Sequence, residues 1–552
     1  MYLNQALKSL GKKCPKVEFN GISYDSRNIK RKNIFFAIQG NKTSGLKFLK
    51  EVEKKGASAI IFDKKIKLSN RNIPFIKVKN ARKNLSEACS NFYRKKPKNI
   101  IAVTGTNGKT SVADFFIQIL NLNKIRAASI GTLGIQSQLF KKKTFLTSID
   151  PISLHKYLHH LAKLKINNVI VEASSHGLHQ NRLDYLKPKA GIFTNLSHDH
   201  LDYHKNFKNY LNAKLYLFKK LLNKNSNIIT DITIPEYKKI KKISLRNKLN
   251  LKTIGVGKGD LKIITHEYVG EKQVIKIKYK NNFYNFETNL IGKIQIKNIL
   301  MAMLAAEDTN LKFEKIVNKI SKIKPVNGRL EKIGKIKNNS IVILDYAHTP
   351  DALNTCLKNL KDQFTDRRIA IVFGCGGDRD KFKRPSMGKI ANQYCNKIYL
   401  SDDNPRTEDP KKIRSQIKRK ISKSKVLEIP KREKAIDIAI KNLNSGEILI
   451  VAGKGHENIQ DYGKSKRFFS DRDIILKSIK QKNKKLSKSI KLNILNEESN
   501  LNNFLISSKT KKASINSKEI KKNDIFFAIK GKKKDGNFYL KEALDKGASL
   551  AV

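Results

Sequence analysis

The sequence predicts a multidomain α/β protein whose parallel sheets are covered by helices on both faces. Apolar runs of strand length alternate with amphipathic segments of helix length, and each run ends in small or polar residues. The clearest runs are IIAVTG (100–105), VIVEASS (169–175), AGIFTNLS (190–197), SIVILDYA (340–347), IAIVFGCGG (369–377) and EILIVAGKG (447–455). Ligands of such sheets bind at the carboxyl ends of the strands, so the ends of these runs are the first candidates for a site.

The length predicts several domains. A chain of 552 residues is too long for one ordinary hydrophobic core, and three or four domains are expected. KPKN, KPVNGR and a polar stretch rich in lysine and serine have the composition of linkers. The expected divisions are residues 1–97, 98–325, 326–480, a linker at 481–503, and a last segment at 504–552.

An internal repeat links the two ends of the sequence. Residues 24–59 return at 515–550 in constant register and without a gap, so that Ser26 matches Ser517 and Gly56 matches Gly547. IFFAI occurs in both copies, at 34–38 and at 525–529, and reads as a buried strand. Two copies far apart do not make a solenoid. The pattern indicates a whole domain at the start and a partial second copy of it at the end.

The formal net charge of +67 suggests a nucleic-acid binder, but the distribution of the charge speaks against one. Lysines occur in every segment and rarely alternate with aromatic residues as a base-stacking groove requires. The excess of Lys, Asn and Ile is what A/T-rich codons encode. We therefore expect no nucleic-acid partner, and a basic nucleic-acid-dependent ATPase is the distant alternative. A positive field would still attract anionic substrates.

Nothing in the sequence predicts a membrane or a secreted protein. No apolar run approaches the ~20 residues of a membrane helix, and MYLNQALKSLGKK lacks the pattern of a signal peptide. The five cysteines are scattered without metal-binding spacing and read as reduced thiols. We expect a cytoplasmic monomer without an integral membrane segment.

A glycine-rich loop, GTNGKTS at 105–111, follows the first buried strand and precedes the helical segment VADFFIQIL. Backbone N–H groups of such a loop bind phosphates, Lys109 can neutralise them, and Thr110 can reach Mg²⁺. The alternative is a glycine turn that only joins strand to helix, and Lys-Thr at the helix start disfavours it. The loop is two residues shorter than G-x-x-x-x-G-K-[ST], so it matches a general NTPase poorly.

TGTNGKTS resembles the phosphate loop of the Mur ligases and of the related folylpolyglutamate synthetases. Further segments occur in the family's order, and the resemblance covers the whole chain: GTLG, LTSIDP, VEASSHGLHQNRLD, TNLSHDHLDYH, YLNAKLYLF, DYAHTP, GGDRDKFKRP, DNPRTEDP and AGKGHE. It implies an N-terminal uridine-nucleotide domain, a central P-loop ATPase domain and a C-terminal Rossmann-like domain. It also implies ATP-dependent ligation in peptidoglycan biosynthesis, and thus roles in cell wall biogenesis, cell shape and cell division.

The resemblance implies ATP and Mg²⁺ as cofactors. The residues implied for ATP are Gly105, Thr106, Asn107, Gly108, Lys109, Thr110, Ser111, Asn298, Arg329 and Asp345. Those implied for catalysis or metal binding are Lys109, Thr110, Glu172, His200 and a carbamylated Lys214. Without the family, Lys214 reads as a solvated helix lysine and His198 and His200 as a polar loop. GKIQIK before Asn298 departs from the family's G-x-F-N-x-x-N.

The same resemblance implies a site for a uridylated muramyl dipeptide. Its residues are Ser26, Arg27, Thr147, Ser148, Ser174, Gln180 and Arg182. For the D-S-R motif the alternative is a capped turn at Asp25. Ile149 interrupts the family's spacing in the loop 146–151, and the second copy replaces D-S-R by N-S-K.

D-N-P-R at 403–406 is the form found in ligases that add meso-diaminopimelate to UDP-N-acetylmuramoyl-L-alanyl-D-glutamate. A guanidinium pairs with a carboxylate through two bonds, so Arg406 suits the distal carboxylate that lysine lacks. The implied diaminopimelate residues are Arg379, Asp403, Asn404, Pro405, Arg406, Gly453 and Glu457. A lysine-adding or other ligase of the superfamily is the alternative. The second copy resembles the start of the Mur ligase that adds D-alanyl-D-alanine.

Overall fold

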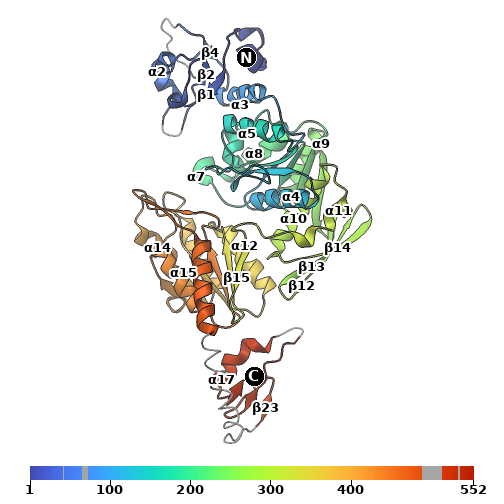
Figure 1. The fold of residues 1–552 in the computed structure, drawn as a ribbon, viewed down its shortest axis with the longest axis vertical. Helices are drawn as coiled ribbons and strands as arrows, with labels where there is room; N and C mark the ends of the chain where they lie inside the picture. Colours follow the sequence, from blue (N-terminus) through green and yellow to red (C-terminus); the bar gives the residue numbers. More distant parts are fainter. Residues whose placement is uncertain (41–42, 65–71, 488–511, 532–534, 552) are drawn as a thin grey trace. The chain divides into compact units, whose positions relative to one another are not determined.

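The computed structural model describes residues 1–40, 43–64, 72–487, 512–531 and 535–551 (Figure 1). They form two compact units, Met1–Val326 and Asn327–Val552, and each is described by itself. The first unit contains a four-stranded and a ten-stranded sheet; the second contains a six-stranded sheet, a hairpin and a three-stranded sheet. This arrangement confirms the predicted α/β class.

The four-stranded sheet is parallel and has the order β1-β2-β3-β4. Its strands are Gly21–Ser23, Asn33–Phe36, Ala59–Phe62 and Phe75–Lys77. Phe36 packs on the face covered by α1 (Leu3–Ala6) and α3 (Ala81–Phe92), and Phe35 faces α2 (Leu49–Lys54) on the other side. The period of two in the strand therefore gives each face its own apolar core.

The ten-stranded sheet has the order β14-β13-β12-β11-β10-β9-β5-β8-β6-β7. In chain order, strands β5 to β14 span Asn99–Thr104, Ala127–Gly131, Gly134–Ser137, Asn168–Glu172, Ala190–Phe193, Asn227–Asp231, Asn250–Val256, Leu261–Val269, Lys272–Tyr279 and Asn282–Thr288. The strands from β6 to β12 in this order pair in parallel, and the edges are antiparallel. The phosphate loop therefore lies at the end of a central strand, β5.

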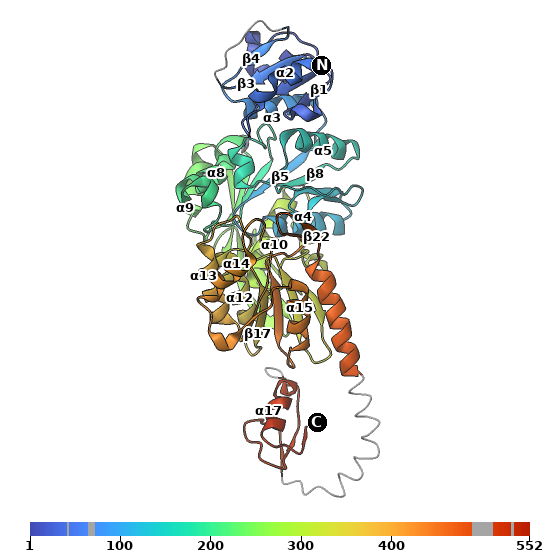
Figure 2. The same ribbon diagram turned by 90° about the vertical axis from the view of Figure 1, so that its left-hand side faces the viewer.

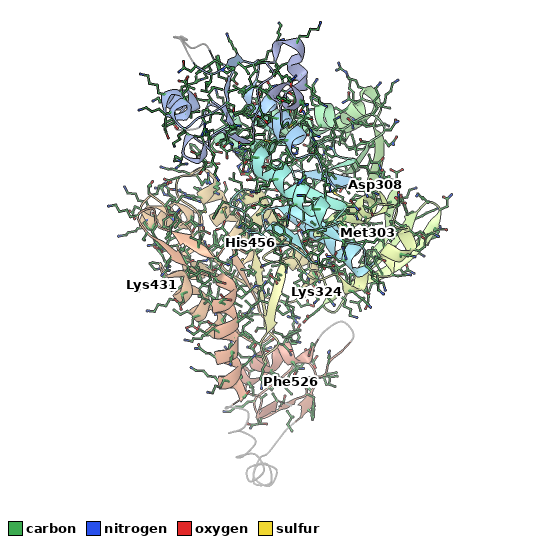
Figure 3. All side chains as sticks on the ribbon, turned by 45° about the horizontal axis from the view of Figure 1, so that its top comes forward. Met303, Asp308, Lys324, Lys431, His456 and Phe526 are labelled. Atoms are coloured by element: carbon green, nitrogen blue, oxygen red, sulfur yellow. The ribbon has the colours of Figure 1, made fainter. Side chains whose placement is uncertain are left out.

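Helices cover both faces of this sheet, as a doubly wound fold requires (Figure 2). One face packs against α4 (Lys109–Leu122), α10 (Lys293–Glu307) and α11 (Phe313–Val317); Met303 of α10, labelled in Figure 3, is wholly buried there. On the other face lie α5 (Pro151–Lys163), α6 (Ser175–His179), α8 (Phe207–Tyr216) and α9 (Tyr237–Arg246). The short α7 spans Leu201–His204.

The six-stranded sheet of the second unit has the order β15-β16-β20-β17-β18-β19, and all pairs but β15–β16 are parallel. In chain order, strands β15 to β20 span Glu331–Lys335, Ile341–Asp345, Ile369–Phe373, Lys397–Leu400, Val426–Glu428 and Ile448–Ala452. The helices are α12 (Pro350–Gln363), α13 (Lys383–Tyr394), α14 (Pro410–Lys418) and α15 (Arg432–Lys441). The hairpin pairs β21 (Ile459–Asp461) with β22 (Lys466–Phe468).

The lysine-rich composition predicts a linker from residue 481, whereas residues 471–487 are helical (Figure 2). Ile475, Ile479 and Lys482 follow helical spacing and are buried. The Lys482 ammonium donates to the carbonyl oxygens of Ile440, Lys441 and Leu443 at 2.9, 3.3 and 2.5 Å. A lysine thus takes a core position of this helix, which hides its apolar period. Residues 488–503 of the expected linker lie outside the described residues.

The second copy of the repeat has the same arrangement of strands and helix as the corresponding part of the first copy. Its strands β23 (Ala513–Ser514), β24 (Ile525–Phe526) and β25 (Leu550–Ala551) are parallel, and α17 spans Leu540–Asp545. Both central strands end before the predicted boundary, because a tight turn closes at Ile38 and Ile529 with N–H···O bonds of 2.9 and 3.1 Å to the second preceding residue. The repeated sequence therefore encodes the same local turn twice.

Two sequence expectations about composition can be followed in the structure. All five cysteines are free and buried. Among the described residues, no helix combines the length and the apolar character that crossing a bilayer takes.

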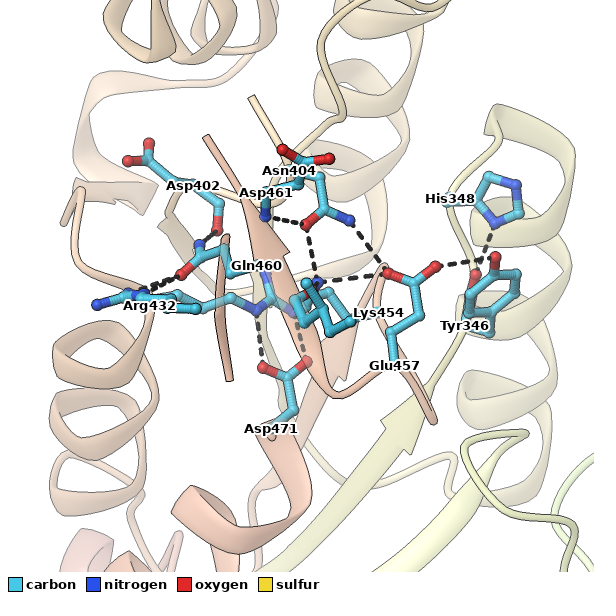
Figure 4. Close-up of polar contacts among 12 residues, drawn as sticks. Tyr346, His348, Asp402, Asn404, Arg432, Lys454, Glu457, Gln460, Asp461 and Asp471 are labelled. Atoms are coloured by element: carbon cyan, nitrogen blue, oxygen red, sulfur yellow. Dashed lines mark hydrogen bonds and ion pairs between the residues drawn. The ribbon is translucent and has the colours of Figure 1, made fainter. Parts of the chain in front are cut away.

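A buried ion pair fixes the end of β20 in the second unit (Figure 4). Arg432 and Asp471 have wholly buried side chains joined by two bonds of 2.8 Å, and Arg432 also donates to the carbonyl oxygen of Ala452 at 2.9 Å. The pair therefore ties α15 and the helix at 471–487 to the strand end that carries GKGHE.

We expect Arg432→Met to lower the free energy of unfolding by about 3–5 kcal/mol, because it leaves the carboxylate of Asp471 buried and unpaired. Urea unfolding measures this change. The matched control is Lys441→Met at the half-exposed Lys441–Asp437 pair, which should cost less than about 1 kcal/mol. Equal effects of the two substitutions would contradict the assigned role of the buried pair.

Candidate functional site: a phosphate loop and two substrate-binding regions

The loop between β5 and α4 is packed so closely that only glycine fits at two positions. Gly105 and Gly108 have φ angles of 145° and 87°. A Cβ atom at Gly105 would lie 1.9 Å from Thr194 Oγ1, and one at Gly108 would lie 2.6 Å from Asn298 Oδ1. The predicted ATP residue Asn298, on α10, therefore does lie against the phosphate loop.

The loop is braced from the neighbouring strand β9. The amide of Asn107 donates to Asn195 Oδ1 at 2.9 Å, and Thr194 Oγ1 donates to the carbonyl oxygen of Asn107 at 2.6 Å. Lys109 curls back over the loop and donates to the carbonyl oxygens of Gly105 and Thr106 at 3.0 and 2.8 Å. Its ammonium thus lies where a phosphate held by the loop would meet it.

Glu172, at the end of β8, is a buried carboxylate that joins three segments. Its oxygens accept bonds from Thr110 Oγ1 (3.1 Å), from the Thr132 amide (2.9 Å) and from Thr132 Oγ1 (3.0 Å). Thr132 Oγ1 also lies 3.0 Å from Thr147 Oγ1. The sequence motif GTLG contained Thr132, but nothing in the sequence showed that this threonine orients Glu172.

The loop 146–151 folds onto the same strand end. Ser148 Oγ donates to the carbonyl oxygen of Glu172 at 2.7 Å and accepts from the Ser174 amide at 2.8 Å. Ile149, which interrupts the family's spacing, is buried in the core of the sheet. Asp150 caps α5 by accepting from the Ser153 amide. The inserted isoleucine therefore anchors the loop while Thr147 and Ser148 face the site.

Gln180 and Arg182 are held in a chain of hydrogen bonds after α6, which Ser174 caps. Arg182 donates to Gln180 Oε1 through Nε (3.2 Å) and Nη2 (2.7 Å), and through Nη1 to the Ser148 carbonyl oxygen (2.7 Å). Gln180 Nε2 donates to the Tyr203 hydroxyl at 3.0 Å. Two predicted substrate residues and the predicted substrate loop are thus in direct contact.

These side chains line a cavity of about 700 Å³ together with the first domain. Ser26, Arg27, Gln180 and Arg182 all border it. Asp25 caps the turn as the alternative reading of D-S-R predicts, since it accepts from the Arg27 amide at 3.0 Å and pairs with its guanidinium at 2.7 Å. The cap and the cavity wall are therefore formed by the same motif.

Lys214 does not lie on a solvated helix face. Its side chain is buried on α8, and its Nζ donates to the carbonyl oxygen of Gly105 at 2.6 Å and lies 4.5 Å from the centre of the Tyr210 ring. Burial, followed by the nearby charge of Lys109, holds the pKa of Lys214 well below its usual range. A lowered pKa favours the neutral form of the amine, which is the form that reacts with CO₂.

His200 immediately precedes α7 and has a left-handed backbone, and its Nε2 lies 3.3 Å from Asp199 Oδ2. Its ring lies 4.8 Å from that of His176. Burial, and then His200, lowers the pKa of His176 to about 4. Among the described residues, no group of three or more His, Cys, Asp or Glu side chains can hold a metal ion. Glu172, His200 and Lys214 therefore stay predicted metal ligands.

In the second unit, Asp345 organises the segment that contains Arg329. Its carboxylate accepts from the amides of Leu330 (2.7 Å) and Ala347 (2.8 Å), and burial raises its pKa. The Arg329 guanidinium lies 4.3 Å from the centre of the Tyr346 ring. Gly328 touches the GKGHE loop, where a Cβ atom would lie 2.5 Å from the amide nitrogen of His456.

Asn404 and Glu457 meet at the carboxyl edge of the six-stranded sheet (Figure 4). Asn404 Nδ2 donates to Glu457 Oε2 at 3.1 Å. Lys454 is wholly buried and donates to Asn404 Oδ1 (3.1 Å), Glu457 Oε2 (3.3 Å) and the Ile459 carbonyl oxygen (2.6 Å). The sequence did not indicate Lys454, because a lysine between two glycines gives no sign of burial.

The DNPR and GGDRD loops are tied together by a buried arginine. Arg384 binds Glu408 through two bonds of 3.0 Å and lowers the pKa of that carboxyl to about 2. Arg406 Nη1 donates to the carbonyl oxygen of Gly377 at 2.6 Å, whereas Arg379 is exposed. Gly453 must be glycine, since its Cβ atom would lie 2.6 Å from Asp403 Oδ2. Pro405 is buried beside them.

The strand–loop–helix segment at 105–111 and the parallel sheets belong to a class of ATP-dependent ligases that the comparisons with known proteins identify. The chain belongs to the Mur ligase family. Family models match residues 18–93 (Mur ligase family, catalytic domain), 103–306 (Mur ligase middle domain) and 328–455 (Mur ligase, glutamate ligase domain).

Relatives over most of the chain bear one name, UDP-N-acetylmuramoyl-L-alanyl-D-glutamate–2,6-diaminopimelate ligase. The protein of Rickettsia montanensis is 43% identical over 83% of this chain and 96% of its own length, and that of Chelativorans sp. is 39% identical over 84% and 95%. A solved structure of a ligase so named has 29% identity and a TM-score of 0.63, covering 87% of this chain and 99% of that one. A MurF ligase from Thermotoga maritima in complex with ADP has the same fold, at 16% identity and a TM-score of 0.58 over 84% of this chain and 98% of that one.

Proposed function

We propose that this enzyme joins meso-2,6-diaminopimelate to UDP-N-acetylmuramoyl-L-alanyl-D-glutamate at the expense of ATP, as a step of peptidoglycan biosynthesis. Two separate observations carry the proposal: the phosphate loop of the first unit with Lys109 folded over it, and the Asn404–Glu457 contact with Arg406 nearby in the second unit. The names of the relatives support the same reaction. The enzyme would be a cytoplasmic monomer.

The reaction needs an activated carboxylate, because the oxygen of a free carboxylate is a poor leaving group. Transfer of the γ-phosphoryl group of ATP to the D-glutamate side-chain carboxylate gives an acyl phosphate and ADP. The diaminopimelate amine then attacks the acyl carbon, expels inorganic phosphate and loses a proton. Lys109 would neutralise charge that develops on the transferred phosphoryl group, while the glycine loop holds the phosphates in line. Asn298, Arg329 and Asp345 would complete the ATP site.

The residues at the phosphate loop also fit a hard divalent cation. Thr110 Oγ1 and the carboxylate of Glu172 lie 3.1 Å apart and offer oxygen atoms of the kind Mg²⁺ takes, and His200 would add a nitrogen. Bound Mg²⁺ would supply Lewis-acid neutralisation of the phosphate charge. Thr132 would hold Glu172 in the orientation that this requires.

We propose that Lys214 carries a carbamate in the active enzyme. Its neutral amine would attack CO₂, form a C–N bond and release one proton, which turns a potential cation into an anion. The new carboxylate would offer oxygen ligands to a divalent cation beside the phosphate loop. Its support is the burial of Lys214 against Gly105, together with its lowered pKa.

Each substrate is assigned to its own region. Residues 1–97 and the cavity wall of 98–325 would bind the uridylated dipeptide, through Ser26, Arg27, Thr147, Ser148, Ser174, Gln180 and Arg182. Residues 326–480 would bind diaminopimelate. There Arg406 would pair with its distal carboxylate and Glu457 with its distal ammonium. Arg379, Asp403, Asn404, Pro405 and Gly453 would complete the pocket.

We further propose that residues 504–552 are the beginning of a second Mur ligase, the one that adds D-alanyl-D-alanine. The support is the repeat of the first domain's turn. Ser514 Oγ accepts from the Asn516 amide as Ser23 Oγ does from that of Asp25, and Lys546 Nζ donates to the carbonyl oxygen of Ser517 as Lys55 Nζ does to that of Ser26. The described part of this copy contains no second phosphate loop.

The assigned reaction is tested by phosphate release from ATP in the presence of UDP-N-acetylmuramoyl-L-alanyl-D-glutamate with meso-diaminopimelate, with L-lysine, or with neither. We expect release that requires both the nucleotide substrate and diaminopimelate. Lys109→Ala should lower kcat by about 10³-fold or more, because an uncompensated phosphoryl charge raises the barrier. Preference for L-lysine would overturn the substrate assignment, and stimulation by nucleic acid alone would overturn the family's reaction in this chain.

The carbamate is tested by depletion of CO₂. We expect activity to fall in CO₂-free buffer and to return on addition of bicarbonate, and ¹³C-bicarbonate to give a carbamate resonance bound to the protein. Lys214→Arg, whose guanidinium does not react with CO₂, should lack the resonance and remain inactive with bicarbonate. A wild-type enzyme that keeps full activity without CO₂ would contradict the modification.

The second copy is tested by a variant that ends at Ser487. Because the site residues lie before that position, we expect the KM values for all three substrates and kcat to equal those of the full chain. A loss of diaminopimelate ligation with an intact thermal transition would show that the second copy takes part in the first reaction, against its assignment to a separate enzyme.

A further inference from the structure

We propose that Tyr346 is a positioning residue that couples the nucleotide-facing Arg329 to the amino-acid pocket at Glu457. The inference rests on the proposed function, since it assigns those two neighbours to ATP and to diaminopimelate. Tyr346 lies in the DYAHTP motif, but none of the substrate, cofactor or catalytic roles given above is assigned to it. It directly follows β16, whose last residue, Asp345, pairs with Ala452 of β20.

The hydroxyl of Tyr346 completes the anchoring of the Glu457 carboxylate. Oε2 accepts from Asn404 Nδ2 (3.1 Å) and Lys454 Nζ (3.3 Å), and Oε1 accepts from the Tyr346 hydroxyl at 3.2 Å (Figure 4). Donors on both oxygens fix the rotation of the carboxylate. Without the tyrosine bond, one oxygen loses its protein donor and the group is held from one side only.

Lys454 and Asn404 hold the other oxygen of the Glu457 carboxylate and are themselves held by hydrogen bonds. Asn404 Oδ1 accepts from Lys454 Nζ (3.1 Å) and from the Asp461 amide (3.0 Å), which leaves its Nδ2 directed to Glu457. Lys454 Nζ donates its third hydrogen bond to the carbonyl oxygen of Ile459. The orientation of the amide is therefore set by the β21 strand, and the tyrosine is the one described donor to Glu457 that comes from the β16 side.

The ring of Tyr346 faces the other ligand region. The Arg329 guanidinium lies 4.3 Å from the ring centre, a cation–π contact, and the ring of His456 lies 5.2 Å away. Gly455 approaches the backbone of Tyr346 closely, since a Cβ atom there would lie 2.9 Å from Tyr346 Cβ. Through its ring and its hydroxyl, the single side chain of Tyr346 therefore contacts both Arg329 and Glu457.

The two contacts of Tyr346 can be separated by substitution. Tyr346→Phe keeps the ring under Arg329 and removes the bond to Glu457, so the KM for meso-diaminopimelate should rise about ten-fold while the KM for ATP is unchanged. Tyr346→Leu removes both contacts, so both KM values should rise. A residue that only supports the fold would lower the thermal midpoint and kcat without splitting the KM values in this way.

A double-mutant cycle decides whether the effect passes through Glu457. Adding Tyr346→Phe to Glu457→Gln should raise the KM for meso-diaminopimelate much less than Tyr346→Phe does alone. The matched control is Tyr279→Phe, which removes a tyrosine–glutamate bond of 2.6 Å to Glu307 in the central domain and should leave every KM at the wild-type value.

The outcomes separate this inference from the proposed function. If wild-type phosphate release does not depend on meso-diaminopimelate, the proposed function fails before any variant is compared. If it does depend on it and Tyr346→Phe has the wild-type KM for that substrate, or the cycle is additive, the coupling through Tyr346 is overturned while the ligase assignment stands.

Discussion

The central site depends on one constraint, namely that the buried carboxylate of Glu172 must accept hydrogen bonds from donors around it. A charge with 1% exposure is tolerated only if hydrogen-bond donors surround it, and these come from the first turn of α4 and from the segment after β6. The carbonyl of the same residue receives Ser148, so the substrate loop is tied to the same strand end. The phosphate loop, the substrate loop and β8 are thereby held in one geometry by one residue.

The positive charge of the site is arranged around a single carbonyl. Lys109 and Lys214 both donate to the oxygen of Gly105, at 3.0 and 2.6 Å. Two ammonium groups that lie close together repel each other. Burial of Lys214, followed by the neighbouring charge of Lys109, lowers the pKa of Lys214. The lowered pKa therefore has a local origin, in the burial of Lys214 and in the charge of Lys109 beside it.

The presence of the strands, the doubly wound central domain and the loop at 105–111 was predictable, because apolar runs and glycine turns are local signals. The settings of particular side chains were not. Thr132 and Lys454 look ordinary in the sequence, and only the fold shows that the first orients Glu172 and the second is wholly buried beneath Glu457. Lys482 occupies a core position of a helix. Because lysine is polar, the sequence did not reveal the helical pattern of burial at 481–487. The type of a residue predicts its average burial, whereas its actual burial depends on which residues the fold packs around it.

The repeat shows how much of a domain's stability lies outside the repeated segment. In the first copy Phe36 is wholly buried, because Leu3 and Leu7 at the N-terminus and Leu85 of α3 cover its face of the sheet. Its counterpart Phe527 is 39% exposed, although the strand, the turn and the following helix repeat the same sequence pattern. The covering residues of the first copy precede residue 24 or follow residue 59, so the repeated stretch encodes the strands and the turn but not their cover. A parallel sheet needs helices on both faces, and in the first domain sequence on either side of the repeat supplies one of those layers.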